Sequence, residues 1–170
     1  IHAIRYNMNM TVLLHDNHIY GLTKKQASPT SPVGTRSNTT PRGSYLDALS
    51  PLTVTLGVQN VSFVAQAVDW IPESLFQILT AAYRHRGFSF VRILQRCPEF
   101  VGNMFEPWLH DPQRMLMLTH ADGIRVSPAL QKIYRNQLPH DPADINRARE
   151  IASSEDPIPV GILYRNPEVP

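Results

Sequence analysis

Residues 61–94, VSFVAQAVDWIPESLFQILTAAYRHRGFSFVRIL, are the stretch from which the fold can be predicted. The stretch begins and ends with nearly continuous apolar runs of strand length, Val61–Ala67 and Phe88–Leu94. Between them, apolar residues recur at helical spacing from Pro72 to about Arg86, and Gly87 is a typical helix stop. The stretch therefore predicts a strand, a helix and a second strand.

The residues upstream extend this alternation of strands and helices. TVLLH (Thr11–His15) is a short apolar strand that ends in polar residues. Ser50 is a suitable N-cap, and Pro51 suits the first position of a helix that runs to about Leu56. Nearly continuous apolar strands that alternate with helices are typical of a parallel sheet with helices on both faces. We therefore predict an α/β fold.

Residues 1–100 form this predicted α/β core, and residues 101–170 form a C-terminal extension packed on it. The segment from residue 98 onward holds ten of the fifteen prolines, which favours short helices and irregular structure. We predict one helix over Pro128–Asn136 and another that is capped at Asp141 and runs to about Ser153. VGILY (Val160–Tyr164) is expected to form a late strand.

Composition and charge exclude several classes of protein. The chain has 170 residues, 42% of them hydrophobic and 18% charged, which is typical of one folded domain, and no apolar run is long enough for a membrane span. The formal charge is +2, with the positive excess in residues 1–60, which suits a small anionic ligand better than nucleic acid. The single cysteine cannot form an internal disulfide and fits a reducing compartment, so we expect a cytoplasmic protein.

Two candidate functional residues follow directly after predicted strands. Asn17 follows the first strand and Cys97 follows the third, and parallel strands place both at the edge of the sheet where ligands bind. Oxygen ligands such as the Asn17 amide suit Mg²⁺, and the turn over residues 20–23 offers N–H groups to phosphate. The spacing leaves two alternatives open: Asn17 caps a plain surface turn, and Cys97 is a small buried apolar residue.

A longer stretch after the first strand resembles a known family. DNHIYGLTKKQASPTSP (Asp16–Pro32) closely resembles the signature of the thiamine-diphosphate-binding β subunit of 2-oxoacid:ferredoxin oxidoreductases. Four other segments are similar to this family: HAIRYN (2–7), SFVAQA (62–67), HRGFSFVRILQRCPEF (85–100) and, more weakly, GILYRNP (161–167). The resemblance implies a thiamine-diphosphate-binding fold.

The resemblance also implies roles for individual residues in metal and cofactor binding. Asn17 is the side-chain ligand of Mg²⁺, and Ile19 offers its backbone carbonyl to the same ion. The residues that line the diphosphate of thiamine diphosphate are Gly21, Leu22 and Thr23. Cys97 is the fourth thiolate of a 4Fe–4S cluster.

The resemblance also relates two lysines in this turn to substrate binding. Lys24 corresponds to a family lysine near the 2-oxoacid, so the resemblance implies a catalytic role. Lys25 stands where the family has glycine, and this departure points to a 2-oxoglutarate-type pocket with an additional carboxylate to bind.

The implied activity is the coenzyme A-dependent oxidative decarboxylation of a 2-oxoacid, with electrons passed through the 4Fe–4S cluster to ferredoxin and with an α subunit as partner. The family's GDG segment and its three N-terminal cluster cysteines are absent from this sequence. We therefore expect the C-terminal part of a β subunit, inactive by itself. The alternative is a non-catalytic interaction module that keeps the fold and the partner interface without a complete cofactor site.

Overall fold

The computed structural model describes residues 1–121, 124–154, 156–166 and 168. Pro167, the last residue of the GILYRNP resemblance, lies outside the described residues. The elements in chain order are α1 (His2–Arg5), β1 (Met10–Asp16), α2 (Pro51–Leu56), β2 (Phe63–Val68), α3 (Pro72–Arg84), β3 (Phe88–Leu94), α4 (Glu106–His110), the 3₁₀ turn η1 (Pro112–Arg114), β4 (Met115–Thr119), α5 (Pro128–Ile133), β5 (Gln137–Pro139), α6 (Ile145–Ala152) and β6 (Ile158–Arg165).

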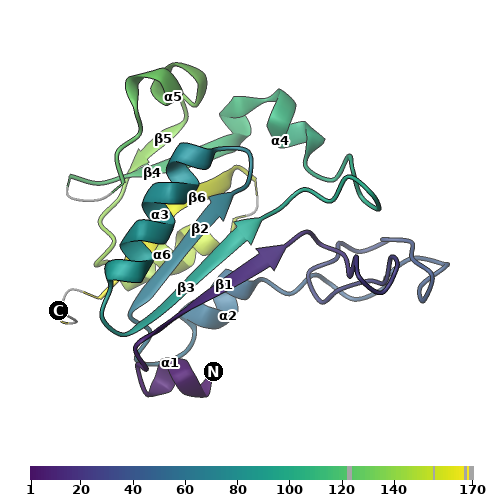
Figure 1. The fold of residues 1–170 in the computed structure, drawn as a ribbon, viewed down its shortest axis with the longest axis horizontal. Coiled ribbons are helices and arrows are strands. Elements are labelled where there is room, and N and C mark those ends of the chain that lie inside the picture. Colours follow the sequence, from purple (N-terminus) through teal and green to yellow (C-terminus); the bar gives the residue numbers. More distant parts are fainter. Residues whose placement is uncertain (122–123, 155, 167, 169–170) are drawn as a thin grey trace.

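Within the described residues, the strands form one sheet of six in the order β1-β3-β2-β6-β4-β5 (Figure 1). The strands β1, β3 and β2 run parallel to one another, as the sequence predicts. The last strand, β6, pairs antiparallel with β2 and parallel with β4, which is itself parallel with β5. The sheet is therefore mixed, with two parallel halves that meet between β2 and β6.

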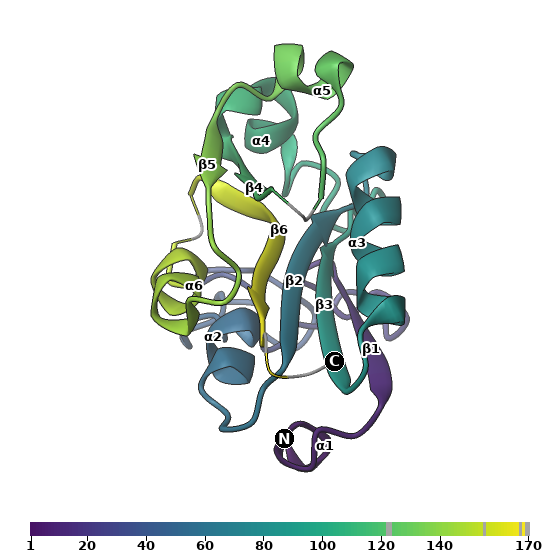
Figure 2. The same cartoon turned by 90° about the vertical axis from the view of Figure 1, so that its left-hand side faces the viewer.

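Helices cover both faces of this sheet, which confirms the predicted α/β architecture (Figure 2). On one face, Ile78 of α3 packs in a core with Val91 of β3. On the other, Leu56 of α2 and Ile151 of α6 pack in a second core with Val64 of β2. Side chains alternate between faces along a strand, so strands with apolar residues at every position serve both cores.

Residues 101–170 add strands to the same sheet, in addition to helices. The predicted late strand is confirmed as β6, which is buried almost throughout. The predicted cap at Asp141 is wrong. The side chain of Asp144 accepts the N–H groups of Asn146 and Arg147, so the cap of α6 lies three residues later than predicted, while Asp141 accepts the N–H of Ala143 in the preceding turn.

None of the helices in the described part of the chain is both long enough and apolar enough to cross a membrane.

Candidate functional site

The loops that follow β1 and β3 leave the sheet at the same edge. Asp16, the last residue of β1, is in register with Leu94, the last residue of β3. The next residue along, Gln95, donates its backbone N–H to the carbonyl of Asp16 at 2.9 Å. Since the strands are parallel, Asn17 and Cys97 both lie just beyond this carboxyl edge.

Asn17 and Ile19 form a tight turn immediately after β1. The Oδ1 atom of Asn17 accepts the backbone N–H of Ile19 at 3.1 Å. The Ile19 side chain is buried, and its carbonyl oxygen accepts no hydrogen bond from the described residues. Asn17 therefore does act as a local cap, yet its amide oxygen keeps a second lone pair, and the Ile19 carbonyl keeps both.

The next turn is closed by two backbone hydrogen bonds between Tyr20 and Gln26, of 2.8 and 3.3 Å. Inside it, the N–H groups of the three predicted diphosphate-binding residues, Gly21, Leu22 and Thr23, have no acceptor among the described residues. Leu22 is 99% exposed, so the turn projects into solvent. A row of unpaired N–H groups in an exposed turn is suited to binding an anion.

The same turn lies against the segment that follows Cys97. A Cβ atom built on Gly21 would be 3.8 Å from the ring of Phe100. Cys97 is a free thiol of intermediate exposure, and its carbonyl accepts the N–H of Val101 at 3.2 Å. The alternative of a buried apolar cysteine does not describe this partly accessible side chain.

Lys24 and Lys25 both adopt left-handed backbone conformations, with φ of 62° and 67°. Their carbonyls accept hydrogen bonds from Asn38, from its side chain at 2.6 Å to Lys24 and from its backbone at 3.2 Å to Lys25. A side chain in this region costs about 1–2 kcal/mol relative to glycine. Lys25 thus has a backbone conformation that glycine adopts without strain.

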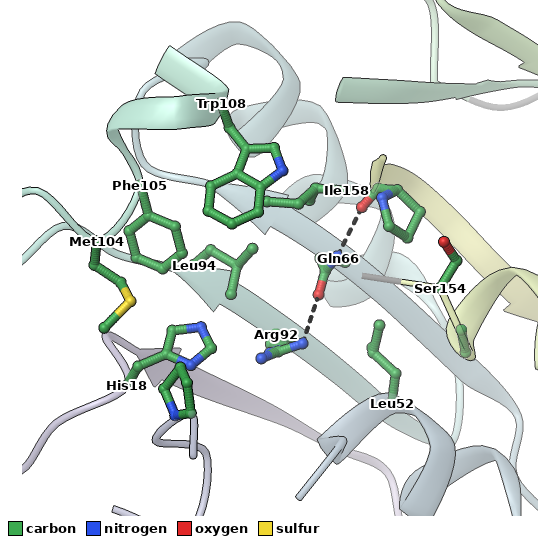
Figure 3. A pocket seen from close by; sticks show the side chains of 13 residues that line it. His18, Leu52, Gln66, Arg92, Leu94, Met104, Phe105, Trp108, Ser154 and Ile158 are labelled. Atoms are coloured by element: carbon green, nitrogen blue, oxygen red, sulfur yellow. Dashed lines mark hydrogen bonds between the residues drawn. The ribbon is translucent and has the colours of Figure 1, made fainter. Parts of the chain in front are cut away.

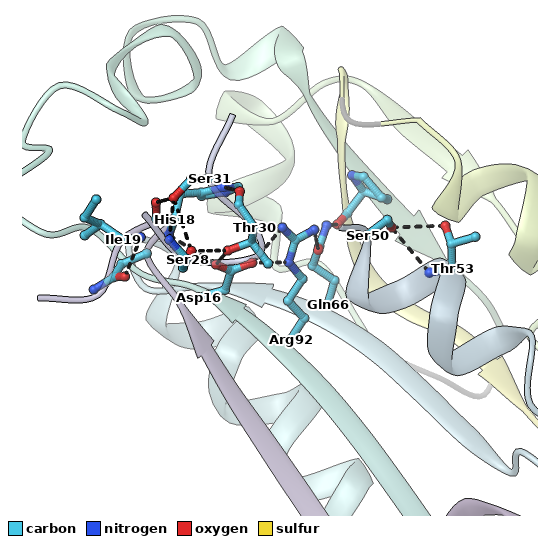
Figure 4. Close-up of polar contacts among 12 residues, drawn as sticks. Asp16, His18, Ile19, Ser28, Thr30, Ser31, Ser50, Thr53, Gln66 and Arg92 are labelled. Carbon is cyan, nitrogen blue, oxygen red and sulfur yellow. Dashed lines mark hydrogen bonds and ion pairs between the residues drawn. The ribbon is translucent and has the colours of Figure 1, made fainter. Parts of the chain in front are cut away.

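A buried charged pair supports these loops and was not predicted as functional. The carboxylate of Asp16 pairs with the guanidinium of Arg92 at 2.7 Å, with side chains only 3% and 5% exposed (Figure 4). Burial by itself raises the pKa of Asp16, but the charges of Arg92 and His18 and the Thr30 hydrogen bond lower the pKa below its ordinary value. The signal in the sequence was an arginine inside the apolar run FSFVRIL, since a buried charge needs a partner.

Two cavities flank this edge. The larger, of about 360 Å³, is lined by Asn17 and Ile19 together with residues of the 28–30 segment, of α2 and of β3. Gly21, Leu22, Thr23, Lys24 and Cys97 do not line it. The smaller, of about 100 Å³, lies between Arg92, His18, Phe105 and Trp108 (Figure 3). Among the described residues, no group of three or more His, Cys, Asp or Glu side chains is arranged so that it could hold a metal ion.

Comparison with known protein families identifies the domain to which the first three strands of the chain belong. Residues 1–93 match the model of the thiamine pyrophosphate enzymes' C-terminal TPP-binding domain, where thiamine pyrophosphate is thiamine diphosphate. Because this match covers more than half of the chain, the chain belongs to the thiamine pyrophosphate enzyme family through this TPP-binding domain. Residues 129–170 match the C-terminal region of the pyruvate ferredoxin oxidoreductase β subunit.

Individual relatives confirm the resemblance to β subunits of 2-oxoacid:ferredoxin oxidoreductases. A 2-oxoglutarate oxidoreductase subunit from Mycobacterium tuberculosis is 41% identical over 126 residues, which are 73% of this chain and 34% of that protein. A 2-oxoacid:ferredoxin oxidoreductase β subunit from a Sulfolobus species is 31% identical over 99% of this chain and 52% of its own length.

A solved structure agrees in fold as well as in sequence. It is the 2-oxoglutarate:ferredoxin oxidoreductase from Magnetococcus marinus with 2-oxoglutarate, coenzyme A and succinyl-CoA bound. The two align with a TM-score of 0.75 and 31% identity, over 96% of this chain and 50% of the other. This chain therefore spans about half or less of the length of these relatives.

Proposed function

We propose that this chain is the C-terminal part of the β subunit of a 2-oxoacid:ferredoxin oxidoreductase, which decarboxylates a 2-oxoacid oxidatively, forms an acyl-coenzyme A and reduces ferredoxin. The observation that carries the proposal is that Asn17 and Ile19 line one cavity at the carboxyl edge of a TPP-binding domain. Similarity to proteins named for this activity supports it over most of the chain.

In this proposal, Asn17 Oδ1 and the Ile19 carbonyl bind Mg²⁺. The fit rests on their free lone pairs and on the preference of Mg²⁺ for oxygen ligands shared with a substrate diphosphate. The unpaired N–H groups of Gly21, Leu22 and Thr23 bind the diphosphate of the cofactor. When bound, thiamine diphosphate supplies the carbanion chemistry of decarboxylation, and the protein positions it and excludes competing reactions.

We assign the substrate-facing role to Lys24 and Lys25. Both lie at the end of the diphosphate-binding turn, and a lysine ammonium is a compact positive charge that attracts carboxylates. Lys24 acts next to the 2-oxoacid group. Lys25 contributes the second cation, which supports 2-oxoglutarate as the substrate.

Cys97 provides one thiolate of the 4Fe–4S cluster in this proposal. Its partly accessible thiol and the contact of its segment with Gly21 support a cluster beside the cofactor. In this proposal, the remaining cysteines and a third protein ligand of Mg²⁺ come from outside these 170 residues. We further propose a cytoplasmic complex with an α subunit, in which residues 1–100 form the TPP-binding core and residues 101–170 an extension.

The test is an assay of the complete complex, purified without oxygen. With coenzyme A and ferredoxin present, we expect 2-oxoglutarate to support ferredoxin reduction at a kcat/KM at least about tenfold above that of pyruvate, the discrimination expected of a site with a dedicated cation. Absence of turnover with every 2-oxoacid would reject the proposal.

A non-catalytic interaction module remains the second candidate. Exposed apolar residues in the 20–49 segment favour it: Leu22 is 99% exposed, Tyr45 86% and Leu46 64%. This alternative predicts a stable complex with a partner chain but neither thiamine diphosphate binding nor turnover, so the same preparation separates the two functions.

A further inference from the structure

The two oxygens of the Asp16 carboxylate bind different parts of the molecule. The Oδ2 atom accepts from Arg92, from Nε at 2.8 Å and Nη2 at 2.7 Å. The Oδ1 atom accepts the backbone N–H of His18 at 3.1 Å and the hydroxyl of Thr30 at 2.6 Å. Since both carboxylate oxygens accept hydrogen bonds from the protein, Asp16 acts as a structural acceptor at the base of the loop that follows β1.

The Oδ1 contacts hold the two ends of the loop over residues 17–31 together. His18 and Thr30 lie on opposite arms of this loop, and a further bond of 2.5 Å joins the His18 ring to the Thr30 carbonyl. Ser31 adds a hydroxyl bond of 2.5 Å to the His18 carbonyl. His18 sits between Asn17 and Ile19, so its backbone position determines where their two oxygens lie.

Arg92 anchors this carboxylate to the middle of the sheet. Its Nη1 atom donates to the Gln66 side chain at 3.3 Å, and Gln66 in turn donates to the carbonyl of Pro159 at 2.8 Å (Figure 4). The line of polar contacts therefore crosses from β1 through β3 and β2 to β6. Arg92, Gln66 and Asp16 are each at least 95% buried, so the geometry is sheltered from solvent exchange.

We propose that Asp16 and Arg92 are positioning residues for the Mg²⁺ and thiamine diphosphate site, which they hold in place through His18. Asp16 also lines the cavity of Asn17 and Ile19, but protein donors already engage both of its carboxylate oxygens. This inference rests on the proposed function. A buried ion pair contributes little net stability compared with well-packed apolar residues, but it imposes a specific geometry. A metal site requires that geometry to within about half an ångström.

The experiment compares variants in the complete complex. The double variant Asp16→Leu/Arg92→Met removes both charges, so no buried charge is left unpaired, and it removes both Oδ1 contacts to the loop. The single variant Arg92→Met keeps those contacts but releases the carboxylate from its anchor. The matched control is Arg96→Met, which breaks the exposed ion pair of Arg96 with Asp69 near the same edge.

Two measurements are made on each variant. Calorimetric titration gives the Mg²⁺ concentration for half-maximal binding of thiamine diphosphate, and hydrogen exchange without cofactor reports the amides of His18 and Ile19. For the double variant, we expect the Mg²⁺ concentration for half-maximal binding to rise at least about tenfold, which is the size of effect seen for residues that orient metal ligands. We also expect faster hydrogen exchange at the amides of His18 and Ile19. We expect the control to match the wild type.

A double variant that keeps the wild-type Mg²⁺ dependence and exchange rates would overturn the positioning role. If Arg92→Met does not fold, the double variant decides, because it carries no unpaired buried charge. Asn17→Ala, measured in parallel, distinguishes loss of the proposed metal site from loss of its positioning by Asp16 and Arg92. Unchanged binding in Asn17→Ala rejects the proposed metal site, and with it the positioning role. Weakened binding in Asn17→Ala with unchanged binding in the double variant rejects only the positioning role.

Discussion

Gln95 donates its backbone N–H to the carbonyl oxygen of Asp16 at 2.9 Å, which joins the first residue after β3 to the last residue of β1. Asn17 follows Asp16 directly, and Cys97 comes two residues after Gln95. The candidate magnesium ligand and the candidate cluster ligand are therefore attached to one hydrogen-bonded point at the edge of the sheet, although eighty positions separate them in the chain.

The first prediction concerns Asn17. In the complete protein, Asn17→Ala should weaken Mg²⁺-dependent binding of thiamine diphosphate by about 100-fold or more, since even residues that only orient metal ligands cost about 10–100-fold. Isothermal calorimetry measures this affinity. Asn146→Ala, at an exposed position of α6, is the control and should bind like the wild type. Wild-type affinity in Asn17→Ala would refute the assignment.

The second prediction concerns Cys97. Cys97→Ser should abolish or alter the low-temperature EPR signal of the reduced complex, because a serine hydroxyl replaces a thiolate ligand of the iron. Glu99→Gln, an exposed neighbour in the same loop, should leave the spectrum unchanged. An identical spectrum in the Cys97 variant would show that the cluster is bound elsewhere.

The third prediction separates the backbone of Lys25 from its side chain. Lys25→Gly should raise the free energy of unfolding by up to about 1.5 kcal/mol. The substitution relieves about 1–2 kcal/mol of left-handed backbone strain, and the entropy cost of glycine is smaller, about 0.5–1 kcal/mol. Lys25→Val should lower it. Denaturant titration measures both changes.

The same substitution tests substrate recognition. If the Lys25 ammonium binds the second carboxylate, Lys25→Gly should raise the KM for 2-oxoglutarate about tenfold or more, the size expected from loss of a hydrogen bond between charged groups. The KM for pyruvate, which lacks that carboxylate, should not change. Equal effects on both substrates would contradict a specificity role for Lys25.

The fourth prediction concerns pH. Burial and then the charge of Arg165 lower the pKa of His85, which lies 3.0 Å from the Ser62 hydroxyl. Because the unfolded chain binds the proton more readily, His85 contributes stability above its unfolded pKa of about 6.5, and this contribution is lost as pH falls through the folded value. Unfolding free energies measured from about pH 7 to about pH 5 should therefore fall less steeply for His85→Gln than for the wild type. Asn146→Ala, an exposed substitution that removes no titratable group, should keep the wild-type slope.

Much of the local structure could be predicted because it depends on neighbouring residues. Phe88–Leu94 and Pro51–Leu56 form the predicted strand and helix, since an apolar run and a Ser-Pro cap act within a few residues. Asp144, and not Asp141, caps α6, because two aspartates three residues apart offer equivalent side chains and only the path of the chain selects one.

The sequence by itself determined the type of most elements, the turn after β1 and the family resemblance, because these depend on residue types at short spacing. Only the tertiary structure decided that β6 lies between β2 and β4, antiparallel to β2 and parallel to β4, and that Arg92 faces Asp16 across 76 positions of chain. An apolar strand such as β6 can pair equally well with several other strands. A charged residue inside an apolar strand, such as Arg92, requires a partner, but the sequence does not indicate which residue that partner is. Those choices are made when distant segments pack together and each buried polar atom finds a hydrogen bond.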